Sequence, residues 1–172
     1  MNAVLAERRV GGPGDYVLAR LIAFALPALL LLGALGSQYF GGLHPCEMCY
    51  WQRWPHGVAV VLAALAFTVP AGSSRATSLT LLAAAAIAVS GAIGVYHAGV
   101  EAKIFQGLTT CTALIHSGST EDVLKQITQA PLIRCDQVQF RFLGISMAGW
   151  NAILSLGGAA TILFLSLRSR RA

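Results

Sequence analysis

Residues 21–40 have the sequence LIAFALPALLLLGALGSQYF, twenty positions without one charged side chain. A helix of about 20 mostly apolar residues is long enough to cross the hydrocarbon core of a bilayer. The run is longer than the roughly 7–15-residue apolar core of a signal peptide. We therefore interpret it as a membrane span, and removal as a signal peptide with cleavage near the small residues 34–36 is the alternative.

The composition of the whole chain supports a membrane protein. Of its 172 residues, 56% are hydrophobic and 11% are charged, against about 25% charged in a typical soluble domain. The mean hydropathy is +0.67. The sequence contains no basic stripe interleaved with aromatic residues, which argues against nucleic-acid binding.

Three further apolar runs follow, so the sequence predicts an all-α integral membrane four-helix bundle in a single domain, residues 1–172. We expect helices over about 19–40, 49–70, 78–97 and 145–167, joined by outer loops at 41–48 and 98–144.

The second run is the weakest span, because it is clearly apolar only over residues 57–69. It reaches spanning length only by extending back to about Cys49. That extension places three polar side chains in its outermost turns: Gln52, Arg53 and His56.

The third run contains small residues one helical turn apart, at Ala84, Ala88 and Ala92. Small residues at this spacing let two helices approach closely. We expect this ridge to face a neighbouring helix.

The basic residues are concentrated on one side of the predicted membrane. Segments 1–20, 70–78 and 168–172 carry seven basic and two acidic residues, whereas 41–54 and 97–144 carry five of each. The positive-inside rule makes the basic side cytoplasmic. Both termini are then cytoplasmic, and a long loop between the third and fourth helices lies on the outer face with all four cysteines, where disulfides can form.

The four cysteines carry most of the chemistry of the chain. Cys46 and Cys49 are separated by two residues, whereas Cys111 and Cys135 are far apart. Pro45 suits the first position of a helix, and a helix N-terminus favours a thiolate. A Cys-x-x-Cys at a helix start is typical of redox disulfides, although zinc sites use the same spacing.

The four cysteines allow four interpretations. Covalent haem attachment requires a histidine after the second cysteine, and Tyr50 stands there. Zinc binding by all four is disfavoured, because Cys111 and Cys135 form no tight knuckle and the compartment is oxidising. Two inert structural disulfides remain an alternative. A thiol–disulfide relay between two pairs is the interpretation that we favour.

Arg53 lies one helical turn after Cys49, so both share one face. We hypothesise that Arg53 stabilises a Cys49 thiolate and donates hydrogen bonds to a polar head group. The alternative is an interfacial arginine that reaches lipid phosphate. His97, at the outer end of the third span, can assist proton movement in the same pocket or simply face water. His44, His56 and His116 are interpreted as interfacial or loop residues.

The residues that carry this chemistry resemble the DsbB family, the bacterial disulfide bond formation protein B. The resemblance covers most of the chain, and three segments and two cysteines carry it: PCEMCYWQR at residues 45–53, GVYH at 94–97, Cys111 and Cys135, and FLGISMAGWN at 142–151.

The resemblance implies an inner-membrane oxidoreductase with both active pairs on the periplasmic side. It would reoxidise a periplasmic thioredoxin-fold oxidase of the DsbA type and pass the electrons to ubiquinone or menaquinone. By position, Cys111 and Cys135 would exchange with the partner, and Cys46 and Cys49 would lie next to the quinone. The resemblance also implies that Cys49 contacts the quinone ring and that Arg53 lies at its head group, with His97 as a further quinone-site residue. It implies no metal.

Two other functions remain open from the sequence. A vitamin K epoxide reductase-like protein also combines a membrane bundle, a quinone and a Cys-x-x-Cys. In that family the motif lies late in the bundle, whereas here it follows the first span. A non-enzymatic membrane scaffold with two structural disulfides is the second alternative.

Overall fold

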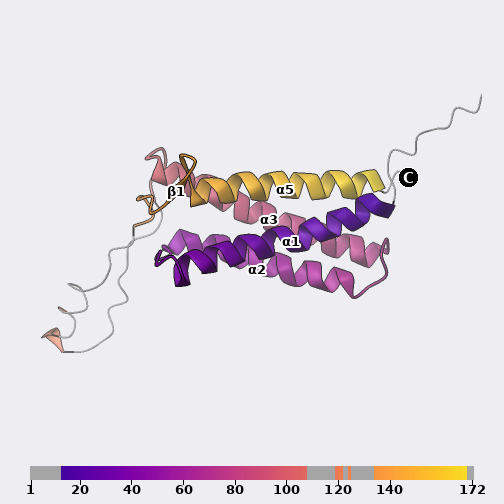
Figure 1. The fold of residues 1–172 in the computed structure, drawn as a ribbon, viewed down its shortest axis with the longest axis horizontal. Helices are drawn as coiled ribbons and strands as arrows, with labels where there is room; N and C mark the ends of the chain where they lie inside the picture. Colours follow the sequence, from indigo (N-terminus) through magenta and orange to yellow (C-terminus); the bar gives the residue numbers. More distant parts are fainter. Residues whose placement is uncertain (1–12, 108–118, 122–123, 125–133, 170–172) are drawn as a thin grey trace, which may run out of the picture.

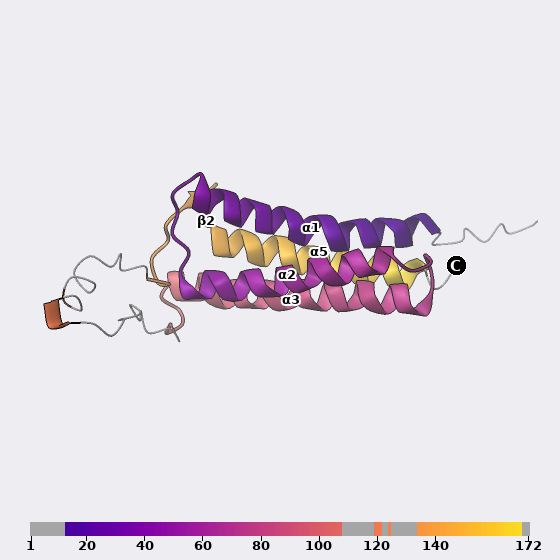
Figure 2. The ribbon, with the colours of Figure 1, turned by 90° about the horizontal axis from the view of Figure 1, so that it is seen from below.

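The computed structural model describes residues 13–107, 119–121, 124 and 134–169, so Cys111 and His116 lie outside the described residues. Four long helices lie side by side in one bundle (Figures 1 and 2). They are α1 (Pro13–Tyr39), α2 (Glu47–Phe67), α3 (Ser74–Glu101) and α5 (Met147–Ser169). The expectation of a helical protein is thereby confirmed.

Three of these helices, α1, α3 and α5, are long and apolar enough to cross a membrane. Within the described part of the chain, α2 does not reach the same standard of hydropathy. Its N-terminal half contains Gln52, Arg53 and His56, which lower its hydropathy.

Many large apolar side chains lie on the outside of the bundle, and alanines make up much of its interior. Leu29, Leu32 and Phe164 are more than half exposed, whereas Ala59 and Ala83 are fully buried. A protein in water would bury the large side chains first, because burial of apolar area is favourable there. In a bilayer the lipid covers the large side chains, and small residues allow close helix packing.

Two glycines of α3 lie directly against α5. A Cβ atom at Gly94 would lie 3.0 Å from the Ala148 carbonyl oxygen, and one at Gly91 would lie 2.8 Å from the Leu156 side chain. Of the expected ridge, Ala84 is buried but Ala92 is exposed. Ala88 packs against the buried core, so the expected ridge is wrong only at Ala92, and the contact with α5 there involves Gly91 and Gly94 instead.

A short hairpin precedes α5. Strands β1 (Arg141–Phe142) and β2 (Ile145–Ser146) pair antiparallel. Leu143 and Gly144 join them with φ angles of 51° and 81°, as a two-residue type I′ turn requires. The Ser146 hydroxyl then accepts a hydrogen bond from the Gly149 amide at 3.2 Å and caps the first turn of α5.

The two ends of the bundle are chemically different. The start of α1, the α2–α3 connection and the end of α5 lie together, where Arg168 pairs with Asp15 at 3.1 Å. The α1–α2 connection, the end of α3 and the hairpin lie at the opposite end. Cys46 and Cys135 belong to this second end.

Candidate active site

Cys46 is the residue that caps the N-terminus of α2. Its backbone is extended (φ −77°, ψ 172°), and its sulfur accepts a hydrogen bond from the Cys49 amide at 3.4 Å. Helix α2 therefore begins at Glu47, and the expectation that Pro45 is the first helical residue is wrong. The cap satisfies a backbone N–H group that would otherwise lack a partner, and it leaves Cys46 with 4% of its surface exposed.

The two sulfurs of the Cys-x-x-Cys lie 2.9 Å apart, at hydrogen-bonding separation. The hydrogen bond to Cys49, together with burial, raises the pKa of the Cys46 thiol. Either sulfur can be the donor in this hydrogen bond.

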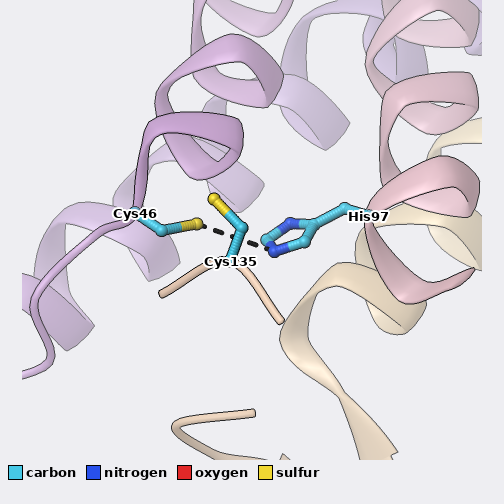
Figure 3. A group of neighbouring side chains, drawn as sticks. All are labelled: Cys46, His97 and Cys135. Atoms are coloured by element: carbon cyan, nitrogen blue, oxygen red, sulfur yellow. Dashed lines mark hydrogen bonds between the residues drawn. The ribbon is translucent and has the colours of Figure 1, made fainter. Parts of the chain in front are cut away.

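His97 and Cys135 meet Cys46 at the end of the bundle (Figure 3). The His97 Nε2 atom lies 3.6 Å from the Cys46 sulfur. The Cys46 sulfur, the Cys135 sulfur and a ring nitrogen of His97 all lie within 4.8 Å of one another. All three residues are buried, and His97 has 3% of its surface exposed. The expectation that His97 simply faces water is therefore wrong.

This trio is also the group that could hold a metal ion among the described residues. A structural zinc site normally has four ligands, and three are present here. The proximity of two sulfurs that are far apart in the sequence is equally what exchange between two cysteine pairs requires.

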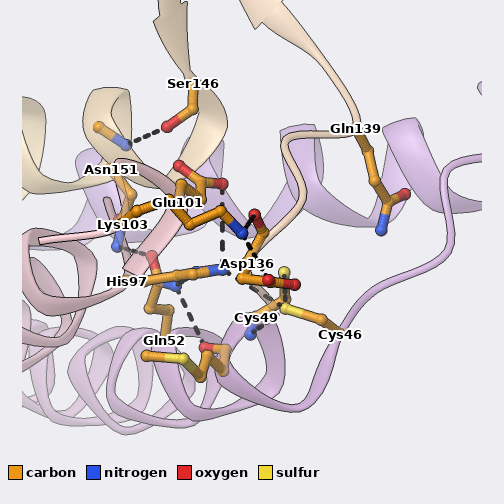
Figure 4. Close-up of polar contacts among 12 residues, drawn as sticks. Cys46, Cys49, Gln52, His97, Glu101, Lys103, Asp136, Gln139, Ser146 and Asn151 are labelled. Atoms are coloured by element: carbon orange, nitrogen blue, oxygen red, sulfur yellow. Dashed lines mark hydrogen bonds and ion pairs between the residues drawn. The ribbon is translucent and has the colours of Figure 1, made fainter. Parts of the chain in front are cut away.

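Polar contacts hold the segment around Cys135 over the site (Figure 4). The Lys103 ammonium donates to the Asp136 backbone oxygen at 3.0 Å and also pairs with its carboxylate. Arg134 pairs with the same carboxylate at 2.8 Å. These two cations, Arg134 first, lower the pKa of Asp136. Gln139 adds a hydrogen bond from its side chain to the His44 carbonyl oxygen.

Arg53 is oriented toward α1. Its guanidinium donates to the Gln38 side-chain oxygen and to the Ala34 carbonyl oxygen, the latter at 3.1 Å. The same group lies 5.3 Å from the centre of the Tyr50 ring. These protein contacts mean that Arg53 does not depend on lipid phosphate for its hydrogen bonds.

A cavity of about 620 Å³ connects these residues. Apolar residues of α1 line one part of it, and polar side chains line the rest. The polar set contains every described residue that the sequence predicted for the site except Cys135, and adds others: Cys46, Cys49, Gln52, Arg53, His56, His97, Glu101 and Asn151. Cys135 lies beside the cavity, next to Cys46. Cys111 is outside the described residues.

The structure adds a buried polar network that the sequence did not predict. Gln52 contacts His97 at 2.8 Å, and the Asn151 amide donates to the Gln52 side-chain oxygen at 2.8 Å. His56 contacts the Asn151 oxygen at 2.8 Å. His56 is 3% exposed, so its interpretation as an interfacial residue is wrong. A polar residue such as Asn151 inside an apolar span was the available signal.

Comparison with known proteins identifies the family of this chain. The family model for disulfide bond formation protein DsbB matches residues 17–165. The disulfide bond formation protein B of Methylococcus capsulatus is 32% identical over 149 residues, which cover 83% of this chain and 90% of that protein. The one from Xanthomonas campestris is 26% identical, covering 87% and 90% respectively.

An uncharacterized protein of Rickettsia prowazekii is also similar, at 24% identity over 88% of this chain and 87% of that protein. No solved structure matches the chain. The family match and the three apolar helices together describe a multi-pass membrane protein of disulfide bond formation, an oxidoreductase. The chain belongs to the DsbB family of disulfide bond formation proteins.

Proposed function

We propose that this chain reoxidises a DsbA-like dithiol oxidase of the periplasm and passes the two electrons to a membrane quinone, ubiquinone or menaquinone. The observation that supports it most is the position of Cys46. Its sulfur lies beside Cys49 at 2.9 Å and within 4.8 Å of the Cys135 sulfur, at the edge of an apolar cavity that also contains Arg53.

The cavity residues fit a quinone. The apolar wall of the cavity, which α1 forms, suits a lipid-soluble ring and tail. Arg53 has further N–H groups besides the two that donate to Gln38 and Ala34 of α1. Cys49 and Arg53 both line this space. A bound quinone would supply an acceptor for two electrons and two protons.

The relay that we propose begins outside the bundle. A reduced partner dithiol attacks a Cys111–Cys135 disulfide, so that the partner becomes a disulfide and two thiols form on the loop. The Cys135 thiolate then attacks the Cys46 sulfur of a Cys46–Cys49 disulfide, and Cys49 leaves as a thiolate next to the cavity. Cys111 in turn attacks Cys135, which restores the loop disulfide and leaves Cys46 and Cys49 reduced.

The last step returns Cys46 and Cys49 to a disulfide. The two electrons and the two thiol protons leave through the cavity. In sum, one partner dithiol and one quinone become one partner disulfide and one quinol. Arg53 would orient an oxygen of the bound ring and stabilise negative charge near Cys49.

We also propose that the chain is a single domain of the bacterial inner membrane in which all four helices span the bilayer and both termini are cytoplasmic. The basic excess of the sequence supports this direction. The grouping of the α1 start, the α2–α3 connection and the α5 end at one end of the bundle agrees with it. The cysteine end would then face the periplasm, where a soluble partner can dock.

The test is anaerobic stopped-flow mixing of a reduced DsbA-like partner, this protein and either quinone, followed by quinone absorbance. We expect one quinone to be reduced for each partner disulfide formed, and no reduction in a Cys46→Ser variant. Oxidation of the partner without loss of quinone absorbance would contradict the electron acceptor. Failure to oxidise the partner at all would contradict the whole proposal.

A further inference from the structure

The buried network beside the cysteines has a direction that backbone carbonyls determine. A carbonyl oxygen only accepts hydrogen bonds, so the side-chain atom beside it must be a donor. The Gln52 side-chain nitrogen lies 3.1 Å from the Met48 carbonyl oxygen. The Asn151 side-chain nitrogen lies 3.2 Å from the Ser90 carbonyl oxygen. Both amide groups therefore have one possible orientation.

The amide orientations determine the hydrogen on each histidine. The Gln52 NH₂ group must donate to His97 Nδ1 at 2.8 Å, so this nitrogen carries no hydrogen. A neutral imidazole then carries its hydrogen on Nε2, the atom that lies 3.6 Å from the Cys46 sulfur. His97 therefore presents an N–H group toward the Cys46 sulfur, with the Cys135 backbone as a second hydrogen-bond partner of the ring, and it has no free nitrogen that can take the Cys46 proton.

Asn151 keeps the Gln52 amide in this orientation. It donates to the Gln52 side-chain oxygen, while its own oxygen accepts from Ser155 at 2.9 Å and from His56 Nε2 at 2.8 Å. His56 then has its hydrogen on Nε2. Its Nδ1 atom is buried without a hydrogen-bond partner among the described residues. The free basic nitrogen of the network thus belongs to His56, which His97, Gln52 and Asn151 separate from the Cys46 sulfur along the hydrogen-bond chain.

We propose that Gln52 and Asn151 are positioning residues that hold His97 as a hydrogen-bond donor to the Cys46 sulfur. His97 then stabilises negative charge on Cys46 while that sulfur exchanges partners, instead of acting as a base. The hydrogen position on His97 does not depend on the proposed function. Its use during turnover rests on the proposed relay. The other titratable groups around the Cys46 sulfur are Cys49, Cys135 and Glu101, whose carboxylate lies 3.9 Å from His97 Nε2.

The direct test is ¹⁵N NMR of the full chain labelled on its histidine rings, with the His97 signals identified by their loss in His97→Gln. We expect hydrogen on Nε2 and none on Nδ1 in the wild-type protein. In Gln52→Leu the preference should be lost, because nothing then donates to Nδ1. In Asn151→Leu it should weaken, because the Gln52 amide then has only the Met48 carbonyl oxygen to fix its orientation. Thr80→Val is the matched control, since Thr80 is buried and its hydroxyl donates only within α3 to the Ala76 carbonyl oxygen.

A second measurement follows the consequence for Cys46. In a Cys49→Ser, Cys111→Ser, Cys135→Ser background, the pH dependence of Cys46 alkylation reports its thiolate. We expect the midpoint to rise by about one pH unit in Gln52→Leu and by less in Asn151→Leu, because the hydrogen bond from His97 to the charged form of Cys46 is lost or weakened. The Thr80→Val midpoint should equal that of the background.

Hydrogen on His97 Nδ1 in the wild-type protein would overturn the inference. Unchanged ring signals and an unchanged alkylation midpoint in both leucine variants would overturn it as well. Neither measurement uses a quinone or a partner, so a protein that shows the expected ring signals but reduces no quinone would contradict the proposed function alone.

Discussion

Arg53 provides the sharpest test of the cavity as a quinone site, and the change is Arg53→Met. Methionine has a similar length and keeps the apolar stem of the side chain, but it removes the charge and all five N–H donors. In the protein two of those donors reach Gln38 and Ala34 on α1. The remaining N–H groups are the ones available to an oxygen inside the cavity.

The size of the effect follows from that count. A hydrogen bond from a charged donor contributes roughly 1.5–3 kcal/mol, and 1.4 kcal/mol corresponds to about a tenfold change in affinity. Loss of one such bond to a quinone oxygen should therefore raise the KM for quinone by about 10- to 100-fold. Exchange between the partner and the loop cysteines should change little, because the hydrogen bonds of Arg53 go to Gln38 and Ala34 on α1.

The assay is anaerobic quinone reduction at several quinone concentrations, with partner oxidation followed separately by thiol trapping. Arg141→Met is the matched control, since Arg141 is exposed on β1 and lies outside the cavity lining. An unchanged KM and kcat for quinone in Arg53→Met would refute the role of Arg53. An equal loss of partner exchange would show that the variant disturbs the whole site instead.

Three other predictions concern the helix packing, the ion pairs of Asp136 and the approach of Cys46 to Cys135. Gly94→Ala should destabilise the bundle by roughly 1–3 kcal/mol, seen as a lower Tm in detergent, while Gly36→Ala, whose new Cβ would meet nothing within 4 Å, should not; equal Tm values would contradict the close approach of α3 and α5. Asp136→Asn should speed alkylation of Cys135, since the ion pairs to Lys103 and Arg134 are lost. Because the folded chain lowers the pKa of Asp136, its ion pairs with Lys103 and Arg134 are complete above the ordinary carboxyl pKa and weaken as the pH falls through the lowered value. An alkylation rate of Cys135 that changes neither with acid nor with Asp136→Asn would contradict this role of the ion pairs. In a Cys49→Ser, Cys111→Ser variant, mild oxidation should link Cys46 to Cys135, whose sulfurs lie within 4.8 Å, and a gel showing only free thiols would exclude their approach.

Several features of the fold were predictable because they depend on local sequence. Uncharged runs of about 20 residues predict long helices wherever they occur, and the helices at Pro13–Tyr39, Ser74–Glu101 and Met147–Ser169 follow them. The ridge of Ala84, Ala88 and Ala92 was predicted less well. Which face of α3 meets α5 depends on the partner helix, and Gly91 and Gly94 allow the closer contact.

The sequence by itself determined the membrane character, the helical class and the identity of the reactive groups. Composition and the spacing of Cys46, Cys49 and Arg53 along one helix are local properties, so they can be read without a partner segment. Family resemblance also rests on such short motifs.

Only the tertiary structure decided how residues from different helices combine. It placed Cys135 beside Cys46, turned His97 inward and joined Gln52 on α2 to Asn151 on α5. No periodicity encodes these contacts, because they depend on the rotation and depth of each helix in the bundle. Once the helices pack, a buried polar group must find a hydrogen-bond partner, and that requirement gives the network its single direction and His97 its hydrogen.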